Sequence, residues 1–313
     1  MMNNAKSHRR AGLHVGLVRA TGAKAARFIA RWAPFTVGLV LLLSAGNATI
    51  LDSARDSGTG SKLDASQLAG EVMQKEINAQ VQDQSLWSYR EVQEKGGQKK
   101  VFEVVQTKAG EIDRLVSLEG TTLDSEQRHA EDERIHKLLT HPALIQREVK
   151  KQRDDAQQAR TLMKTFRNAF QFEYEGLEGN FIKLRFSPSP NFHPSGHAEQ
   201  VFHHMEGTLL VDAKEKRLAG IAGRLTTEVK FGDGVLGHLD KGGTFSVKQQ
   251  DVGSGHWEMT LMDVEMNGRV LFFKTIAVTE KDTYSGFRLT PATATLQQAA
   301  ELTKAANISE ALH

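Results

Sequence analysis

The 313-residue chain contains no cysteine. This absence excludes disulfide bonds, thiolate metal sites, a cysteine nucleophile and a lipid-modified cysteine. Long hydrophobic runs are scarce as well. The apolar run at residues 33–46 covers 14 residues, which is shorter than the roughly 20 that a membrane-spanning helix needs. We therefore expect no permanent membrane span.

Acidic residues are missing from positions 1–48, where Lys and Arg contribute seven positive charges. This basic segment leads into the apolar run, which ends in the small residues of Gly46-Asn47-Ala48, in the order of a secretory signal peptide. We expect cleavage after Ala48 and a periplasmic or otherwise secreted mature protein. Two alternatives stay open: an uncleaved N-terminal anchor, and a twin-arginine signal at Arg9-Arg10, which lies far from the apolar run.

The net charge of the whole chain is +2, and the seven cations of positions 1–48 account for its positive sign. Without these seven cations the chain has 33 Lys and Arg (40 − 7) against 38 Asp and Glu, a net charge of −5. A nucleic-acid partner therefore loses its main support. Residues 49–62 are small and polar and predict a flexible leader, so the folded part starts near residue 63.

Helical and strand patterns alternate along the remaining chain. Residues 64–83 predict a helix with Leu68, Val72, Met73, Ile77 and Val81 on one apolar face. The runs 87–93, 101–107 and 112–118 alternate between apolar and polar residues, and glycine-containing turns separate them. They predict a three-stranded meander.

The stretch 121–167 changes character, because it has no glycine, one proline and many charges. It predicts two helices that divide at His141-Pro142, the second with an apolar stripe. The charges suit either a solvated helix face or a surface that docks a partner.

Strand patterns return from residue 170 to residue 291, and Asn267-Gly268 predicts a type I′ hairpin turn between two of them. Short turns favour antiparallel pairing of roughly ten strands. We expect an α+β fold with an incomplete, half-open antiparallel barrel and helices on or across its concave face. The predicted domain covers residues 63–292 with a helical insert at 121–167, and residues 293–313 form a terminal helix or tail.

The spacing G-x-G-x-x-G occurs at Gly232, Gly234 and Gly237. A dinucleotide fingerprint needs a helix that opens from its last glycine, but here strand alternation resumes at 244–250. We interpret these glycines as a turn and expect no cofactor.

Few residues stand in patterns typical of a catalytic or metal site. The densest histidine cluster matches no zinc spacing and gives only weak metal candidates: His193, His197, His203 and His204. Asp212, His256 and Ser254 form a second candidate set, for a hydrolase, but no G-x-S-x-G elbow accompanies them. We name no catalytic residue.

Apolar residues of both parities gather on one predicted hairpin, which either lines a cavity or belongs to the core. They are Trp257, Met259, Leu261, Met262, Val264, Met266, Leu271, Phe272 and Phe273.

The order of elements resembles the periplasmic lipoprotein-carrier superfamily of LolA and LolB, which includes stress-sensing proteins of the RseB kind. The resemblance rests on the helix at 64–83, Trp87-Ser88-Tyr89-Arg90 at the start of the meander, the strand 205–212 with its G-T-L-x-x-D pattern, and Arg217-Leu218 on the returning strand. It covers most of the chain after the signal, through unspecific short motifs. The absence of cysteine excludes an anchored receptor of the LolB kind.

This resemblance implies a non-catalytic envelope protein that binds a lipid or a lipoprotein acyl chain, in the manner of lipoprotein sorting. The expected cavity residues are Phe181, Leu184, Phe186, Leu209, Val211, Trp257, Met259, Leu261, Leu271 and Phe272. A first alternative is an envelope-stress or assembly factor that binds a protein partner through the charged helices at 128–167. A second is a metal-assisted hydrolase that uses the histidines of 193–204.

Overall fold

The computed structural model describes residues 64–270 and 274–310, so the predicted signal peptide and its cleavage at Ala48 lie outside the described residues. Within these two ranges no helix is long and apolar enough to cross a membrane. The helices are α1 (Ala65–Gln82), α2 (Ser125–Thr140), α3 (Pro142–Ala169), the short α4 (His197–Gln200) with the 3-10 turn η2 (Val201–His204), and α5 (Leu296–Glu310).

Thirteen strands form one antiparallel sheet, three more than the ten that the sequence predicts. They are β1 (Trp87–Lys95), β2 (Gln98–Thr107), β3 (Gly110–Leu118), β4 (Thr121–Thr122), β5 (Phe170–Glu178), β6 (Phe181–Pro188), β7 (Met205–Asp212), β8 (Leu218–Leu225), β9 (Val229–Phe231), β10 (Gly237–Leu239), β11 (Thr244–Asp251), β12 (Trp257–Val270) and β13 (Lys274–Leu289).

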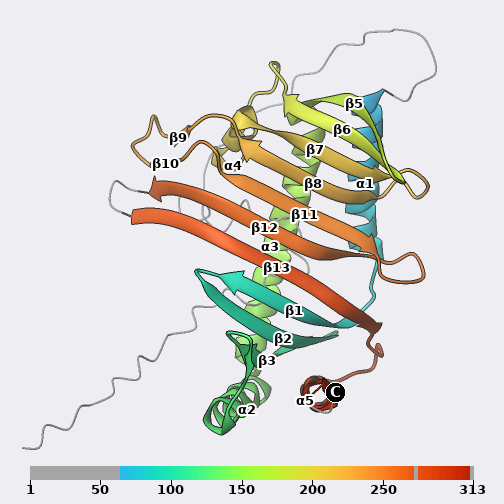
Figure 1. Ribbon diagram of the computed structural model, residues 1–313, viewed down its shortest axis with the longest axis vertical. Helices are drawn as coiled ribbons and strands as arrows, with labels where there is room; N and C mark the ends of the chain where they lie inside the picture. The colour runs from blue at the N-terminus through green and yellow to red at the C-terminus, as the bar shows by residue number, and fades with distance from the viewer. Residues whose placement is uncertain (1–63, 271–273, 311–313) are drawn as a thin grey trace, which may run out of the picture.

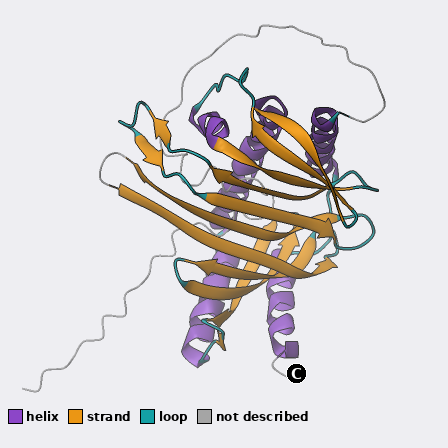
Figure 2. Ribbon diagram, turned by 45° about the horizontal axis from the view of Figure 1, so that its top comes forward, coloured by secondary structure: helices purple, strands orange, loops and turns teal. Residues whose placement is uncertain are grey.

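The main path through the sheet is β4-β3-β2-β1-β13-β12-β11-β8-β7-β6-β5, while the small strands β9 and β10 extend from β12. The sheet bends strongly but its two ends do not meet (Figures 1 and 2). The predicted α+β fold with a half-open antiparallel barrel is confirmed.

Local chemistry explains where the helices begin. Pro142 begins α3, where its missing N–H costs nothing. Asp124 and Gln127 form a full capping box at α2, whereas at α1 the Asp64 side chain accepts a hydrogen bond from the backbone N–H of Ser66. The predicted apolar face of α1 needs one correction: Val81 is 59% exposed, and the charged Glu76 is buried instead.

Helices α1 and α3 lie against one face of the sheet, behind it in Figure 1, and α5 packs on the other face of β2 and β3. Strand β2 is therefore buried on both sides: Phe102 and Val104 belong to the main core, and Val105 belongs to a smaller cluster with Ile112 and Ala299. We call the face under α1 and α3 the concave face.

Helix α3 spans the whole concave face, because it packs against β3 near one end of the sheet and against β5 at the other. The 25 residue-to-residue steps from Ile145 to Phe170, the residue that follows the helix, span about 37 Å at roughly 1.5 Å each. The nine strand intervals from β3 to β5 add up to about 43 Å along the sheet at roughly 4.8 Å each. The straight helix is therefore shorter than the path along the curved sheet between the same two strands, as a chord is shorter than its arc. Helix α3 thus acts as a strut across the half-barrel.

Glycines in the β7–β8 region make room for aromatic rings. Gly207 pairs with Gly223 in adjacent strands, and they are flanked by Phe186 on β6 and Phe245 on β11. A Cβ on Gly207 would lie 2.6 Å from the ring of Phe186 and would collide with the carbonyl of Ala222. Two phenyl rings thus pack over a pair of glycines, where a side chain on either strand would not fit.

The predicted hairpin turn at Asn267-Gly268 is wrong. Strand β12 continues through both residues to Val270, and Gly268 pairs with Ile276 of β13 and with Leu239 of β10. A Cβ on Gly268 would collide with the carbonyl of His238. Glycine is needed here for close approach of a third strand, rather than for a turn.

The G-x-G-x-x-G segment forms the turn that the sequence predicts. It joins β9 to β10, which pair antiparallel, and Gly232, Asp233 and Gly234 all have positive φ values. No helix follows Gly237, so the segment lacks the helix N-terminus of a phosphate site.

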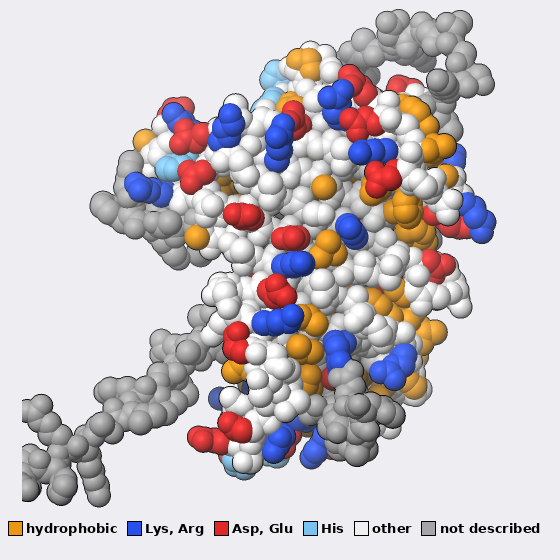
Figure 3. Space-filling model, viewed as in Figure 1, with side chains coloured by type: hydrophobic (Ala, Val, Ile, Leu, Met, Phe, Trp, Pro, Cys, Tyr) orange, Lys and Arg blue, Asp and Glu red, His pale blue; other side chains and the backbone are white. Residues whose placement is uncertain are grey.

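The outward face of the sheet carries interspersed charges of both signs (Figure 3). Arg224 contacts Glu206 at 2.6 Å and Arg185 contacts Glu173 at 3.2 Å, all of them exposed. Such pairs contribute little stability but keep the surface polar. Strand β5 also has a bulge between Tyr174 and Gly176, which helps to blunt the free edge of the sheet.

Candidate functional site

The predicted cavity residues of β6 and β7 lie in the core of the concave face. Leu184, Phe186, Leu209 and Val211 are fully buried, and Phe181 at the strand end is half-buried. The rings of Phe166 and Phe170 pack on Phe186 at centroid distances of 5.3 and 4.8 Å. A cavity of about 20 Å³ lies between α3, η2 and the strands β7 and β8, which is room for about one water molecule.

The apolar hairpin contributes Trp257 and Met259, both buried, and Leu261, which is half-buried. Met259 is part of the main core. Leu271, Phe272 and Phe273 lie outside the described residues. Whether the described part of this hairpin contacts a ligand stays a prediction.

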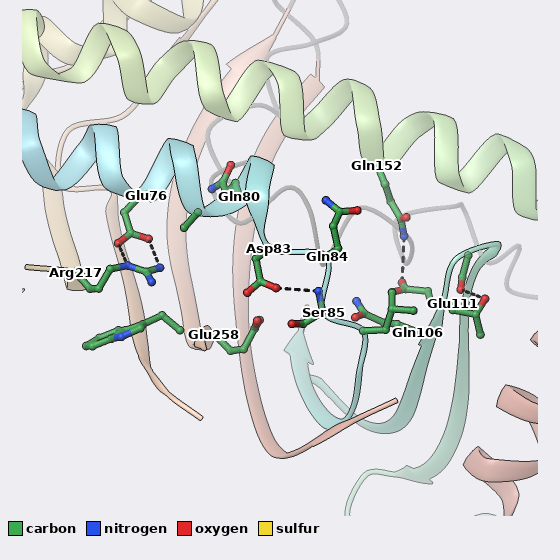
Figure 4. A pocket seen from close by; sticks show the side chains of 15 residues that line it. Glu76, Gln80, Asp83, Gln84, Ser85, Gln106, Glu111, Gln152, Arg217 and Glu258 are labelled. Carbon is green, nitrogen blue, oxygen red and sulfur yellow. Dashed lines mark hydrogen bonds and ion pairs between the residues drawn. The ribbon is translucent and has the colours of Figure 1, made fainter. Parts of the chain in front are cut away.

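A larger pocket of about 240 Å³, with many polar side chains in its lining, lies where α1 ends beside β2, β3, α3 and the start of β12. Figure 4 shows side chains from these elements converging on it. Its lining consists of Glu76, Ala79, Gln80, Asp83, Gln84, Ser85, Leu86, Gln106, Thr107, Gly110, Glu111, Gln152, Arg217, Trp257 and Glu258. We call it the acidic pocket, because it holds four carboxylates and one guanidinium.

A buried ion pair forms one wall of the acidic pocket. Arg217 donates to both carboxylate oxygens of Glu76, at 2.6 and 3.0 Å, and the backbone N–H of Leu218 donates to the same carboxylate at 3.0 Å. The guanidinium also lies 5.6 Å from the ring centre of Trp257, within reach of a cation–π contact. This wall joins α1 to the β7–β8 turn.

Asp83 and Ser85 form a second wall, and His256 lies behind them outside the lining. Asp83 accepts a hydrogen bond from the backbone N–H of Ser85 at 2.8 Å, and His256 Nδ1 lies 3.1 Å from its carboxylate. Burial raises the pKa of Asp83, but the hydrogen bonds from Ser85 and His256 outweigh this effect and lower it below 3.8. Asp83 is therefore ionised at neutral pH.

The inward face of α3 closes the pocket. Gln152 donates to Glu111 of β3 at 3.2 Å, which ties the strut to the sheet (Figure 4). About two turns away, the Ile145 side chain rests on Gly110, where any Cβ would lie 2.7 Å from it. In the N-terminal half of α3, the hydrogen bond of Gln152 and the apolar contacts of Ile145 and Val149 over Gly110 join the helix to β3, whereas its C-terminal half packs into an aromatic core.

The four candidate histidines do not converge. His193 contacts the Asn191 carbonyl, His197 contacts Gln200, and His204 contacts Thr227. Burial lowers the pKa of His204, and the neighbouring His203 adds to the shift. Among the described residues no group of three or more potential ligands could hold a metal ion.

The candidate nucleophilic set is also separated. Asp212 caps a turn by accepting from the N–H groups of Lys214 and Glu215, whereas His256 contacts Asp83. Ser85 lies 3.2 Å from His256 but shares Nδ1 with Asp83. A catalytic triad uses the two different ring nitrogens for its serine and its carboxylate, so this arrangement cannot relay a proton from the serine.

Sequence reasoning missed the acidic pocket. The pair Glu76 and Arg217 is separated by 141 positions; Arg217 was noted only at the start of a returning strand, and Glu76 stands in no motif. One weak signal was present: Glu76 interrupts the apolar stripe of the first helix, which suggests a buried charge with a distant partner.

Comparisons with known proteins add little. No family model matches the sequence, and no curated protein matches it. The crystal structure of a DUF1329 family protein from Desulfovibrio piger ATCC 29098 aligns with 77% of this chain and 99% of that chain, at 8% sequence identity and a TM-score of 0.26. At that score the likeness supports no conclusion about fold or function.

Proposed function

We propose that this protein is a non-catalytic binding protein of the cell envelope that carries a hydrophobic chain, such as a lipid or lipoprotein acyl chain, on its concave face. The observation that carries this proposal is the apolar concave face, bridged from end to end by α3. Burial of apolar ligand surface would supply the driving force. The basic, apolar and small-residue order of positions 1–48 supports secretion.

Loading requires α3 to move, because the described apolar cavity of about 20 Å³ is too small for an acyl chain. The two halves of α3 differ in what holds them. The C-terminal half continues directly into β5 and packs through Phe166 against three other phenyl rings of β5 and β6. The N-terminal half, held by Gln152 and Ile145, is the part that would lift.

A reversible lock tests this account. The chain has no native cysteine, so Glu111→Cys with Gln152→Cys introduces one thiol pair, which a short reducible bis-thiol reagent joins across β3 and α3. We expect the lock to slow loading of a neutral pyrene-labelled alcohol at least tenfold, and reduction to restore it. The matched control is Thr165→Cys with Glu199→Cys, which locks the other half of α3 to α4. Equal loading of both locked proteins would contradict the proposal.

No specific observation favours the alternative in which a protein partner binds the charged helices. Several of those charges already serve the fold. Arg134 pairs with Asp113 and Glu131, and Arg114 contacts Asp132 at 2.5 Å. The electrostatic attraction of Asp113 and Glu131 outweighs burial and raises the pKa of Arg134. These residues dock α2 on β3.

A further inference from the structure

The charged side chains that line the acidic pocket are engaged within the fold. Three of its carboxylates lie within hydrogen-bond distance of a neighbouring side chain: Glu76 with Arg217, Asp83 with His256, and Glu111 with Gln152. The fourth, Glu258, has a partner as well. Burying a charged ligand group costs free energy unless it gains a counter-charge, and engaged carboxylates offer it little. The pocket therefore favours a neutral group.

Uncharged hydrogen-bonding side chains make up a large part of the lining. Four glutamines and two hydroxyl residues border the pocket: Gln80, Gln84, Gln106, Gln152, Ser85 and Thr107. Figure 4 shows the four amides around it. A primary amide carries both N–H donors and a carbonyl acceptor, and a hydroxyl also donates and accepts. Such a lining matches a ligand group with several hydroxyls.

One acceptor of this lining lacks a donor. Gln80 lies one turn after Glu76 on α1. Its side-chain oxygen is buried and has no hydrogen-bond partner within residues 64–270 and 274–310. A buried carbonyl oxygen without a donor costs free energy, which a ligand O–H group would recover.

The pocket also adjoins the apolar interior. Gln106 follows Phe102 and Val104 at alternate positions of β2, and both of these belong to the main core, so Gln106 lies on the same face of the strand. The volume of about 240 Å³ is below the roughly 300–1,000 Å³ of pockets that enclose a whole small ligand. Apolar residues complete the lining: Ala79, Leu86 and Trp257. The pocket therefore suits one end of a longer molecule.

We propose that the acidic pocket binds the neutral, hydroxyl-rich head of a single-chain amphiphile whose hydrocarbon tail lies on the apolar concave face. This inference rests on the proposed function, since it assumes that the concave face holds a hydrophobic chain. It adds the chemical class of the ligand: a neutral polyol head is bound in preference to a carboxylate or a quaternary ammonium.

Four probes with the same twelve-carbon chain test this class: 1-O-dodecylglycerol, dodecanol, dodecanoate and dodecyltrimethylammonium. Each is titrated calorimetrically, below its micellar concentration, into the full-length protein. We expect dodecylglycerol to bind about tenfold more tightly than each of the other three, because its head makes additional hydrogen bonds. Added salt should leave its affinity unchanged, since the head carries no charge. Free glycerol should not bind at these concentrations, because it has no chain to bury.

The variant Gln80→Met tests the pocket itself, because it keeps the length of the side chain and removes the acceptor. It should weaken dodecylglycerol binding about fivefold and leave dodecyltrimethylammonium, which has no donor, unchanged. The matched control is Gln74→Met on the exposed side of α1, where the amide donates only to Asn78 in the same helix. We expect the control to alter none of the affinities.

Equal binding of dodecylglycerol and dodecanol, or tighter binding of either ion, overturns this inference and leaves the carrier standing, since the chain is still bound. Binding of free glycerol as tight as that of dodecylglycerol overturns it as well, because the pocket would then take a soluble polyol. An unchanged dodecylglycerol affinity in Gln80→Met removes the pocket as the site of the head. If that variant does not fold, the probe series on the unaltered protein decides. Failure of all four chain probes contradicts both proposals.

Discussion

The two ends of α3 meet two different interiors. At the β5–β8 end the helix is sealed by aromatic rings and leaves about 20 Å³ of space. At the β2–β3 end it covers a pocket of about 240 Å³ lined by charges and amides. Close packing fixes the first end, because dispersion contacts favour a filled apolar core. Charged and amide side chains at the second end are held by hydrogen bonds of fixed geometry and fill space less completely. This end therefore retains a pocket that a ligand can enter.

The largest effect should come from the aromatic end. Phe186→Ala removes a fully buried ring that packs on Phe166 and Phe170, and we expect a loss of about 3–5 kcal/mol in the free energy of unfolding. Denaturant titration measures it, with Leu177→Ala, 68% exposed in the outer strand β5, as the control near zero. A loss below 1 kcal/mol would mean that this end is not a sealed core.

The ion pair of the acidic pocket should come next. Glu76→Ala leaves the Arg217 guanidinium and the Leu218 N–H buried without their acceptor, and we expect a loss of about 3 kcal/mol. Glu206→Ala removes the equivalent partner of the exposed Arg224 and should cost about 0–1 kcal/mol. Similar losses of unfolding free energy in Glu76→Ala and Glu206→Ala would show that the ion pair of the pocket is as solvated as the surface pair.

The glycine pair offers a smaller test of the aromatic end. Gly207→Ala forces the Phe186 ring and the β8 backbone apart, so we expect a loss of about 1–3 kcal/mol. Gly196→Ala serves as the control, because open space surrounds its Cβ position. Thermal unfolding of both variants measures the difference, and a neutral Gly207→Ala would contradict the proposed ring–glycine packing.

The smallest effect concerns pH. The folded-state pKa of Asp83 is lowered, so its contribution to stability is present above its ordinary pKa of 3.8 and is lost as the pH falls through the folded-state value. Asp83 is partly exposed, so the effect should stay below about 1 kcal/mol. Asp83→Asn should therefore be less stable than the unaltered protein at pH 6, with the gap closing below pH of about 3.8. A gap that widens in acid would contradict this assignment.

Local patterns predicted most of the fold. The meander, the division of two helices at Pro142 and the turn at Gly232 depend on neighbours in the chain, and the structure confirms them. The wrong or missed predictions involve residues whose partners lie far away in the sequence. Gly268 is required by the approach of β10, and Glu76 is buried because Arg217 meets it from across the fold. Single-sequence periodicity contains no information about either partner.

The same limit applies to the candidate site. Leu184 and Leu209 were expected as cavity residues from the family resemblance; they are buried in the core, and their contact with a ligand stays a prediction. The acidic pocket instead depends on five elements meeting at one end of α1, so no stretch of sequence contains its pattern.

Native mass spectrometry with lipid extraction tests the central claim most directly. The protein is purified without detergent from the cells that make it, and its mass is compared before and after delipidation. The account predicts a near-stoichiometric bound amphiphile that delipidation removes and re-addition restores. A mass equal to that of the polypeptide alone, unchanged after incubation with lipids, would contradict it.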